Sequence, residues 1–148
     1  MKVVTGSTWN ESRIESFLLE NATPLRVAVN RNGFPLICSL WFVYLPASQS
    51  FFCASHKNSQ LVQSLLDDDR CGFEVATNEP PYRGVRGQAR VRLSQEGAEE
   101  TLTNLCERFL GESNSGLKDW LFSRIDDEYV LRIEPTWISS WDYSARMD

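Results

Sequence analysis

The sequence contains a single histidine, His56, and its four cysteines stand far apart at Cys38, Cys53, Cys71 and Cys106. No two cysteines form a CxxC pair, and a structural zinc site needs about four nitrogen, sulfur or oxygen ligands. We therefore expect neither a metal site nor a redox dithiol. The cysteines are interpreted as reduced, small apolar residues.

Long apolar runs are also missing. The longest stretch, residues 36–45, is interrupted by Cys38 and Ser39 and is too short to span a bilayer. Residues 1–10 lack the basic start and apolar run of a secretion signal. We therefore expect a cytoplasmic protein that does not enter a membrane. The formal net charge of -5 argues against a nucleic-acid partner, because an acidic protein repels a polyanion.

The overall composition is that of an ordinary globular protein. Its 148 residues, 42% hydrophobic and 24% charged, fit one domain with one core. No internal repeat, low-complexity tract or linker divides the chain, so we expect a single domain over residues 1–148. The GxSxG, HExxH, P-loop and GxGxxG spacings do not occur. A Ser–His–Asp hydrolase would have to use His56 without a nucleophile elbow, so this class is a weak candidate.

Strand signals outnumber helix signals along the chain. Apolar residues recur at helical spacing in residues 10–21, 58–68 and 95–110, and a short helix is expected around residues 117–124. Strand patterns occupy residues 25–30, 36–44, 50–54, 71–76, 84–93, 129–133 and 137–141. This order predicts a mainly β protein, a Greek-key-like β-barrel with peripheral helices, and argues against a parallel doubly wound sheet.

Two local patterns refine this prediction. Asn10 or Ser12 can cap the first helix, and Asn32 with Gly33 favours a hairpin turn, because both residues tolerate positive φ. The run 36–44 is apolar on both sides, which predicts a long central strand.

The junction between residues 50–54 and the helix 58–68 is the most informative segment. His56, Lys57, Asn58 and Ser59 crowd the helix start, where exposed N–H groups and the helix dipole favour an anion. Asn58 or Ser59 can equally serve only as the helix cap, which the spacing alone favours. Both interpretations remain open from the residues themselves.

Three other patterns have ordinary interpretations beside their functional ones. Tyr82, Arg83 and Arg86 suit a planar polar ligand, although a solvated hairpin explains them better. The acidic run 67–69 is interpreted as a solvated turn. Trp41, Trp137 and Trp141 lie in strand patterns. We expect each of them in the core or at a dimer interface.

Several short motifs, taken in order, resemble the pyridoxamine 5′-phosphate oxidase-like, FMN-binding split-barrel family. Gly33 and Pro35 match the family's GxP turn, Ser59 its helix-start serine, and residues 69–70 and 85–89 its dxR and vxGxa steps. The most specific motif is the closing R-[IV]-x-P-x-x-[IV]-x-x-W, which residues 132–141 match without a gap. The likeness covers about residues 20–143.

The resemblance implies a split β-barrel over about residues 24–143, preceded by the helix at about 10–21. It also implies a homodimer that holds FMN between its subunits, with the phosphate near the helix start and the isoalloxazine on the backbone of the second strand. A terminal tryptophan would reach the cofactor from the partner subunit. The implied cofactor-binding residues are Leu40, Trp41, Ser55, His56, Lys57, Asn58, Ser59, Tyr82 and Trp141.

Two departures shape the expected function. Gln60 and Leu61 replace the basic pair that follows the helix-start serine in oxidase members, and only Arg146 follows the final tryptophan where those members carry a substrate-binding segment. We therefore expect an FMN-dependent oxidoreductase of an unidentified small molecule, not a pyridoxal-phosphate-forming enzyme. No catalytic side chain is assigned, because the hydride chemistry belongs to the cofactor.

The alternatives are a relative that binds a deazaflavin or haem in the same groove, and a non-enzymatic module that has lost tight cofactor binding. For haem, His56 is the only histidine that could ligate the iron.

Overall fold

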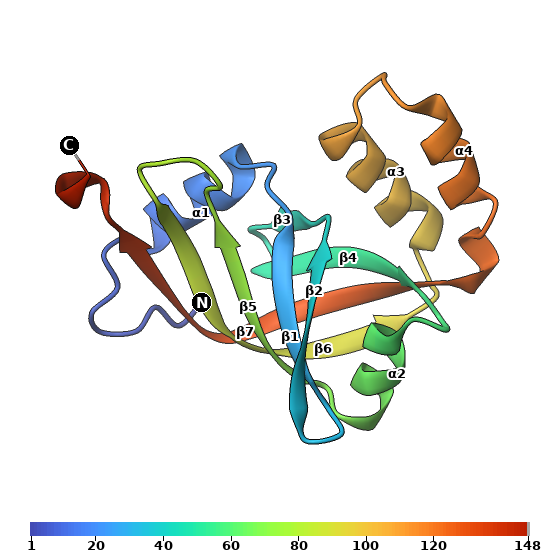
Figure 1. The fold of residues 1–148 in the computed structure, drawn as a ribbon, viewed down its shortest axis with the longest axis horizontal. Helices are drawn as coiled ribbons and strands as arrows, with labels where there is room; N and C mark the ends of the chain where they lie inside the picture. Colours follow the sequence, from blue (N-terminus) through green and yellow to red (C-terminus); the bar gives the residue numbers. More distant parts are fainter. Residues whose placement is uncertain (148) are drawn as a thin grey trace.

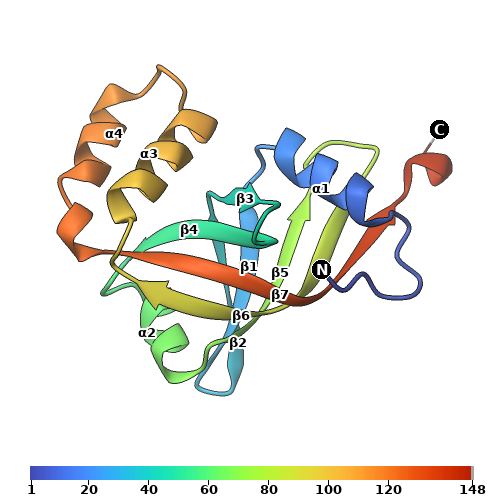
Figure 2. The same cartoon turned by 180° about the vertical axis from the view of Figure 1, so that it is seen from behind.

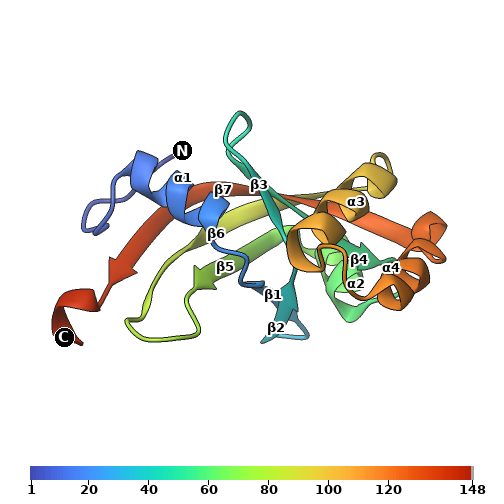
Figure 3. The same ribbon diagram turned by 90° about the horizontal axis from the view of Figure 1, so that it is seen from above.

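In the computed structural model, which describes residues 1–147, seven antiparallel strands form one strongly curved sheet (Figure 1). The strand order is β2-β1-β5-β6-β7-β4-β3. The long strands β6 and β7 run across the molecule, and the shorter strands wrap over them (Figure 3). The bounds are β1 (Leu25–Arg31), β2 (Phe34–Leu40), β3 (Val43–Leu45), β4 (Ser50–His56), β5 (Arg70–Ala76), β6 (Arg83–Ser94) and β7 (Glu128–Asp142).

Helices lie around the sheet rather than between parallel strands, which confirms the mainly β fold with peripheral helices (Figure 2). The helix α1 (Glu11–Glu20) covers one end, α2 (Gln60–Asp67) connects β4 to β5, and α3 (Ala98–Phe109) and α4 (Ser115–Phe122) form a hairpin at the other end. Two 3-10 turns complete the chain, η1 (Ile125–Asp127) and η2 (Ser144–Arg146). No helix among residues 1–147 is long and apolar enough to cross a membrane.

The core is built from alternate strand residues and a group of aromatic rings. Leu25, Val27 and Val29 of β1 point inward, as their period of two predicts. Phe51 is at the centre of the aromatic group, with its ring centroid 5.1 Å from those of Tyr44 and Phe73. Three of the cysteines are buried, and all four are free thiols, which confirms their interpretation as small apolar residues.

The local signals near the chain's start and first hairpin are confirmed. The Oδ1 atom of Asn10 accepts a hydrogen bond of 2.9 Å from the backbone N–H of Arg13, so Asn10 is the cap of α1. Asn32 and Gly33 adopt φ values of 51° and 80° and form the turn between β1 and β2. These positive φ values explain why the hairpin needs these two residues.

The prediction of one central strand over residues 36–44 was wrong. The segment breaks at Trp41 and Phe42 into β2 and β3, which lie at opposite edges of the sheet. Apolar residues on both faces normally indicate burial on both faces, but Phe34 and Ile37 on β2 are 76% and 67% exposed. The outer face of β2 therefore has no cover within one protomer.

The two closing strands predicted at 129–133 and 137–141 are one strand of 15 residues, β7. The register with β6 shifts between Gln88 and Ala89, opposite Pro135. Proline has no N–H and cannot donate a hydrogen bond to the neighbouring strand. A bulge accommodates it because the ladder of hydrogen bonds is interrupted there. Pro135 interrupts the strand pattern in the sequence, but the strand continues through it.

The acidic run 67–69 is a solvated turn, as predicted. The Asp68 carboxylate accepts two hydrogen bonds of 2.8 Å from the Arg70 guanidinium, which lowers the pKa of Asp68 to about 2. Asp69 pairs with Arg90 at 2.6 Å. No group of three or more potential metal ligands comes together within residues 1–147.

The close crossing of β5, β6 and β7 gives a test of the fold. A Cβ atom added at Gly87 would lie 2.7 Å from the Phe73 ring and would also collide with the backbone carbonyl of Trp137. We expect Gly87→Ala to lower the free energy of unfolding by about 1–3 kcal/mol in urea denaturation, because the core has no room for it.

Gly116→Ala is the matched control, since nothing lies within 4 Å of a Cβ at that helical position. Alanine is the better helix former, so this variant should be neutral or slightly more stable. Equal stability losses in both variants would contradict the packing described here.

Candidate functional site

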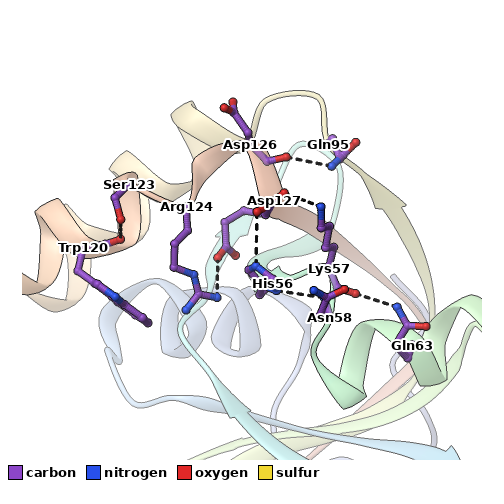
Figure 4. A network of polar contacts seen from close by, with 11 residues as sticks. His56, Lys57, Asn58, Gln63, Gln95, Trp120, Ser123, Arg124, Asp126 and Asp127 are labelled. Atoms are coloured by element: carbon purple, nitrogen blue, oxygen red, sulfur yellow. Dashed lines mark hydrogen bonds and ion pairs between the residues drawn. The ribbon is translucent and has the colours of Figure 1, made fainter.

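The junction between β4 and α2 carries five predicted residues, Ser55 to Ser59, of which Figure 4 shows His56, Lys57 and Asn58. The Ser59 Oγ atom accepts a hydrogen bond of 3.1 Å from the backbone N–H of Val62, so Ser59 is the N-cap of α2. The hydroxyls of Ser55 and Ser59 lie 2.9 Å apart. The backbone N–H of Asn58 donates to Nδ1 of His56 over 3.1 Å. Ser59 is therefore the residue that caps the helix, and the interpretation of this segment as an anion site stays a prediction.

Asp127, which the sequence reasoning missed, holds the charged side chains of this junction. Its carboxylate lies 2.7 Å from Nζ of Lys57 and 3.8 Å from Nε2 of His56, and its carbonyl accepts the Lys57 backbone N–H at 2.8 Å. The hydrogen bond raises the pKa of Lys57 and lowers that of Asp127. The Lys57 side chain is 46% exposed, and exposed ion pairs contribute little to stability, so Lys57 can exchange this partner easily.

Glu128, the next residue, is a second feature that sequence reasoning missed. Its side chain is buried, at 5% exposure, and its carboxylate lies 3.4 Å from the Arg124 guanidinium. Arg124 in turn stacks over the Trp120 ring, with 4.4 Å to the ring centroid (Figure 4). Burial raises the pKa of Glu128, and the nearby Arg124 only partly offsets this effect. The pairing of His56 with Glu128 across β4 and β7 creates this arrangement, and no local pattern in the sequence indicates it.

Leu40 and Trp41 line a cavity of about 310 Å³ beside the junction. The α3–α4 hairpin forms its other side, and the Trp41 ring stacks on Phe109 with centroids 5.5 Å apart and planes at 8°. Ala54 of β4 and Glu128 of β7 line it from the sheet, and Ser55, the next residue of β4, points to the opposite face of that strand. The lining residues are Ser39, Leu40, Trp41, Ala54, Leu102, Leu105, Leu117, Leu121 and Glu128.

Tyr82 and Trp141 do not join this group within one chain. Tyr82 directly precedes Arg83, the first residue of β6. Ala54 of β4 pairs with Val130 of β7, which pairs in turn with Ser94, the last residue of β6. The Tyr82 carbonyl accepts a hydrogen bond of 3.0 Å from Tyr143, whose ring lies 5.2 Å from that of Trp141. The two predicted aromatic residues therefore form a second group at the opposite end of β6.

The three strand tryptophans lie outside the core, which contains Trp9 instead. Trp41, Trp137 and Trp141 are half-buried, and Trp137 donates a hydrogen bond of 3.0 Å to Gln88. The indole Nε1 of Trp141 is buried and has no hydrogen-bond partner among the described residues. A buried donor without an acceptor is costly to the folded protein.

The buried Glu128 carboxylate predicts a pH-dependent stability. Its pKa in the folded protein is raised from the ordinary value of 4.5, so the folded state binds more protons than the unfolded state between these two pKa values. Stability from this group is therefore present below the unfolded pKa and falls as the pH rises through the folded one. We expect the melting temperature of Glu128→Gln, relative to the parent, to increase from about pH 4 to about pH 8.

Glu112→Gln controls for the loss of a surface carboxylate, because Glu112 is exposed. A difference between Glu128→Gln and the parent that stays constant over this pH range would contradict the described burial of the carboxylate.

Comparison with known proteins gives fold relatives only among solved structures, since no protein-family model and no curated protein sequence matches the chain. The conserved hypothetical protein Rv2991 from Mycobacterium tuberculosis matches with a TM-score of 0.78 and 18% identity, covering 100% of this chain and 94% of that one. An F420 reductase gives 0.71 and 19%, covering 93% and 98%. A Listeria innocua protein assigned as a candidate pyridoxamine 5′-phosphate oxidase gives 0.67 and 12%, covering 90% and 98%.

The names of two further matched structures mention FAD or haem. One is a FAD-binding protein from Mesorhizobium loti, with a TM-score of 0.67 and 15% identity, covering 89% of this chain and 94% of that one. The other is HutZ, the haem storage protein from Vibrio cholerae, with 0.66 and 17%, covering 96% and 95%. At identities between 12% and 19%, these likenesses establish the fold alone. The chain has the split-barrel fold of the pyridoxamine 5′-phosphate oxidase-like proteins, as its sequence motifs predict.

Proposed function

We propose that the protein is a homodimeric oxidoreductase that binds a flavin, FMN, between the β4–α2 junction and the backbone around Leu40 and Trp41. The observation that carries this proposal is the pair of hydroxyls at the start of α2 with a lysine beside it. Ser55, Ser59 and Lys57 supply donors and a positive charge there. A flavin mononucleotide needs both an anionic end and an apolar end to its site.

The residues at the β4–α2 junction can hold the phosphate of FMN if Lys57 changes its partner. The Ser59 hydroxyl accepts from Val62 and keeps its own hydrogen for a phosphate oxygen or for Ser55. The N-terminus of α2 adds a favourable dipole. Lys57 would leave Asp127 and turn to the phosphate, a change that its exposure makes easy.

The ring end needs a flat apolar surface and few charges. Leu40 and Trp41 provide that surface, and Trp41 is held in place by its stacking on Phe109. When bound, FMN supplies the hydride chemistry. The chain's own residues bind the cofactor, orient its ring and exclude water from one face, so no catalytic side chain is assigned.

Two observations support a dimer. Phe34 and Ile37 expose the apolar outer face of β2. Trp141 and the β4–α2 junction lie at opposite ends of β6, so one chain cannot bring them to one cofactor. A second copy would bring the partner subunit's Trp141 to the flavin.

The first test is a titration with FMN that follows the quenching of flavin fluorescence. We expect micromolar affinity for the parent and about a tenfold loss for Lys57→Ala, because a charge-assisted hydrogen bond to the phosphate is removed. Lys2→Ala is the control, since Lys2 is an exposed lysine near the N-terminus. Equal FMN affinity in the parent and Lys57→Ala would remove Lys57 from the site.

The shared site gives a second, independent test. Lys57→Ala and Trp141→Ala chains are each expected to bind FMN weakly when purified alone. After random exchange of subunits, half the dimers contain both chains, and about a quarter of all sites regain Lys57 and Trp141 together. Restored tight binding at about that fraction of sites supports the proposal, whereas no restoration in confirmed mixed dimers contradicts it.

The same titration with a deazaflavin and with haem separates the alternatives by their absorption spectra. The Nδ1 atom of His56 already accepts a hydrogen bond from Asn58, so haem iron would have to use Nε2, which faces Asp127. Tight binding of haem or a deazaflavin in preference to FMN would replace FMN in the proposal. No binding of any of the three would favour a module without a cofactor.

A further inference from the structure

We propose that the cavity between the α3–α4 hairpin and Leu40–Trp41 is a binding subsite for a small, mostly apolar molecule that carries a cationic or hydrogen-bond-donating nitrogen. The Glu128 carboxylate would receive that nitrogen. The cavity and its carboxylate stand on their own geometry, and only the competition between the bound molecule and a flavin ring rests on the proposed function.

The size and walls of the cavity define the apolar part of the molecule. Its volume of about 310 Å³ lies at the lower end of the range for small-molecule sites, enough for one substituted ring. Leu102 and Leu105 come from α3, Leu117 and Leu121 from α4, and Trp41 closes the side toward β2. These walls favour an apolar ring, and Ser39 is the one uncharged polar residue among the lining residues.

Glu128 is the one charged residue that lines this cavity. Burying a carboxylate costs several kcal/mol unless good partners surround it. The nearest cation, Arg124, stays 3.4 Å away and stacks on Trp120. The carboxylate therefore has capacity for a further donor, and a donor on a bound molecule would recover part of the burial cost.

The charged groups around Glu128 are Arg124, His56 and the Lys57–Asp127 pair. Arg124 lies 3.4 Å from the Glu128 carboxylate, His56 pairs with Glu128 across β4 and β7, and Lys57 and Asp127 neutralise each other at 2.7 Å (Figure 4). A ligand carboxylate or phosphate in the cavity would be repelled by Glu128. A cationic or N–H-bearing ring is attracted by it.

The helix α4 is suited to cover such a molecule. It contributes no buried residue to the protein, and Leu117 and Trp120 are 41% and 53% exposed. Leu117 and Leu121 stand one helical turn apart and both line the cavity. A ring bound beneath them would bury apolar surface that is now accessible to water, which gives the hydrophobic contribution to binding.

The cavity also shares Leu40, Trp41 and Ala54 with the surface proposed for the flavin ring. Because the cavity has room for one substituted ring, a flavin ring and this molecule would compete for it if FMN binds there. The carboxylate makes the subsite prefer aromatic amines and amidines to aromatic acids.

The test uses benzamidine, a cationic aromatic probe, and benzoate, an anionic probe of similar shape, in isothermal titration calorimetry with the full chain. We expect benzamidine to bind and benzoate not to bind. Glu128→Gln should weaken benzamidine at least about tenfold, because a charge-assisted hydrogen bond is lost. Glu112→Gln, at an exposed position, should bind benzamidine like the parent.

A second variant tests the location of the probe. Leu121→Trp fills the cavity from α4, where Leu121 is half-buried, and should abolish benzamidine binding. Benzamidine bound equally well by the parent, Glu128→Gln and Leu121→Trp would overturn the subsite, as would equal binding of benzoate.

A parallel FMN titration keeps the two proposals distinguishable. Benzamidine binding that depends on Glu128 without any FMN binding would uphold the subsite and refute the flavin proposal. FMN binding without benzamidine binding would refute the subsite and leave the flavin proposal standing.

Discussion

The antiparallel pairing of β6 with β7 is the constraint on which the rest of the structure depends. The two strands stay in register from Arg83 opposite Asp142 to Ser94 opposite Val130, with a single bulge beside Ala89. β5 adds to one side of this ribbon and β4 to the other, so every remaining strand takes its position from it. Gly87 allows the close crossing with Phe73 at the ribbon's middle.

This ribbon separates two groups of candidate site residues. One end carries Tyr82 and Trp141, while the other carries the β4–α2 junction with Glu128 and Asp127. Each group contains an incompletely satisfied feature, the Trp141 indole N–H at one end and the buried carboxylate at the other. Both features are costly in an isolated protomer.

The fold could be predicted from the sequence largely because its signals are local. The period of two in residues 25–30, the Asn32–Gly33 turn and the helical spacing of Ile14, Phe17 and Leu18 each depend on neighbours a few residues away. The closing motif at residues 132–141 indicated the split-barrel family. The prediction failed for residues 36–44, where apolar faces indicate burial but do not say whether the cover comes from the same chain.

The candidate site was only partly predictable for the same reason. The crowding of Ser55 to Ser59 is visible in the sequence, whereas Asp127 and Glu128 reach the junction through strand pairing some 70 residues away along the chain. The acidic residues that neutralise Lys57 and line the cavity therefore carry no local signal. Their roles follow from the register of β4 with β7 and from the burial that the α3–α4 hairpin creates.

The central claim is that one flavin site is assembled from opposite ends of two chains. A crystal structure of the protein grown with FMN tests it most directly. The account predicts the phosphate within hydrogen-bond distance of the Ser55 and Ser59 hydroxyls, with the partner subunit's Trp141 against the ring. An FMN molecule held entirely by one protomer, or bound away from the β4–α2 junction, would contradict it.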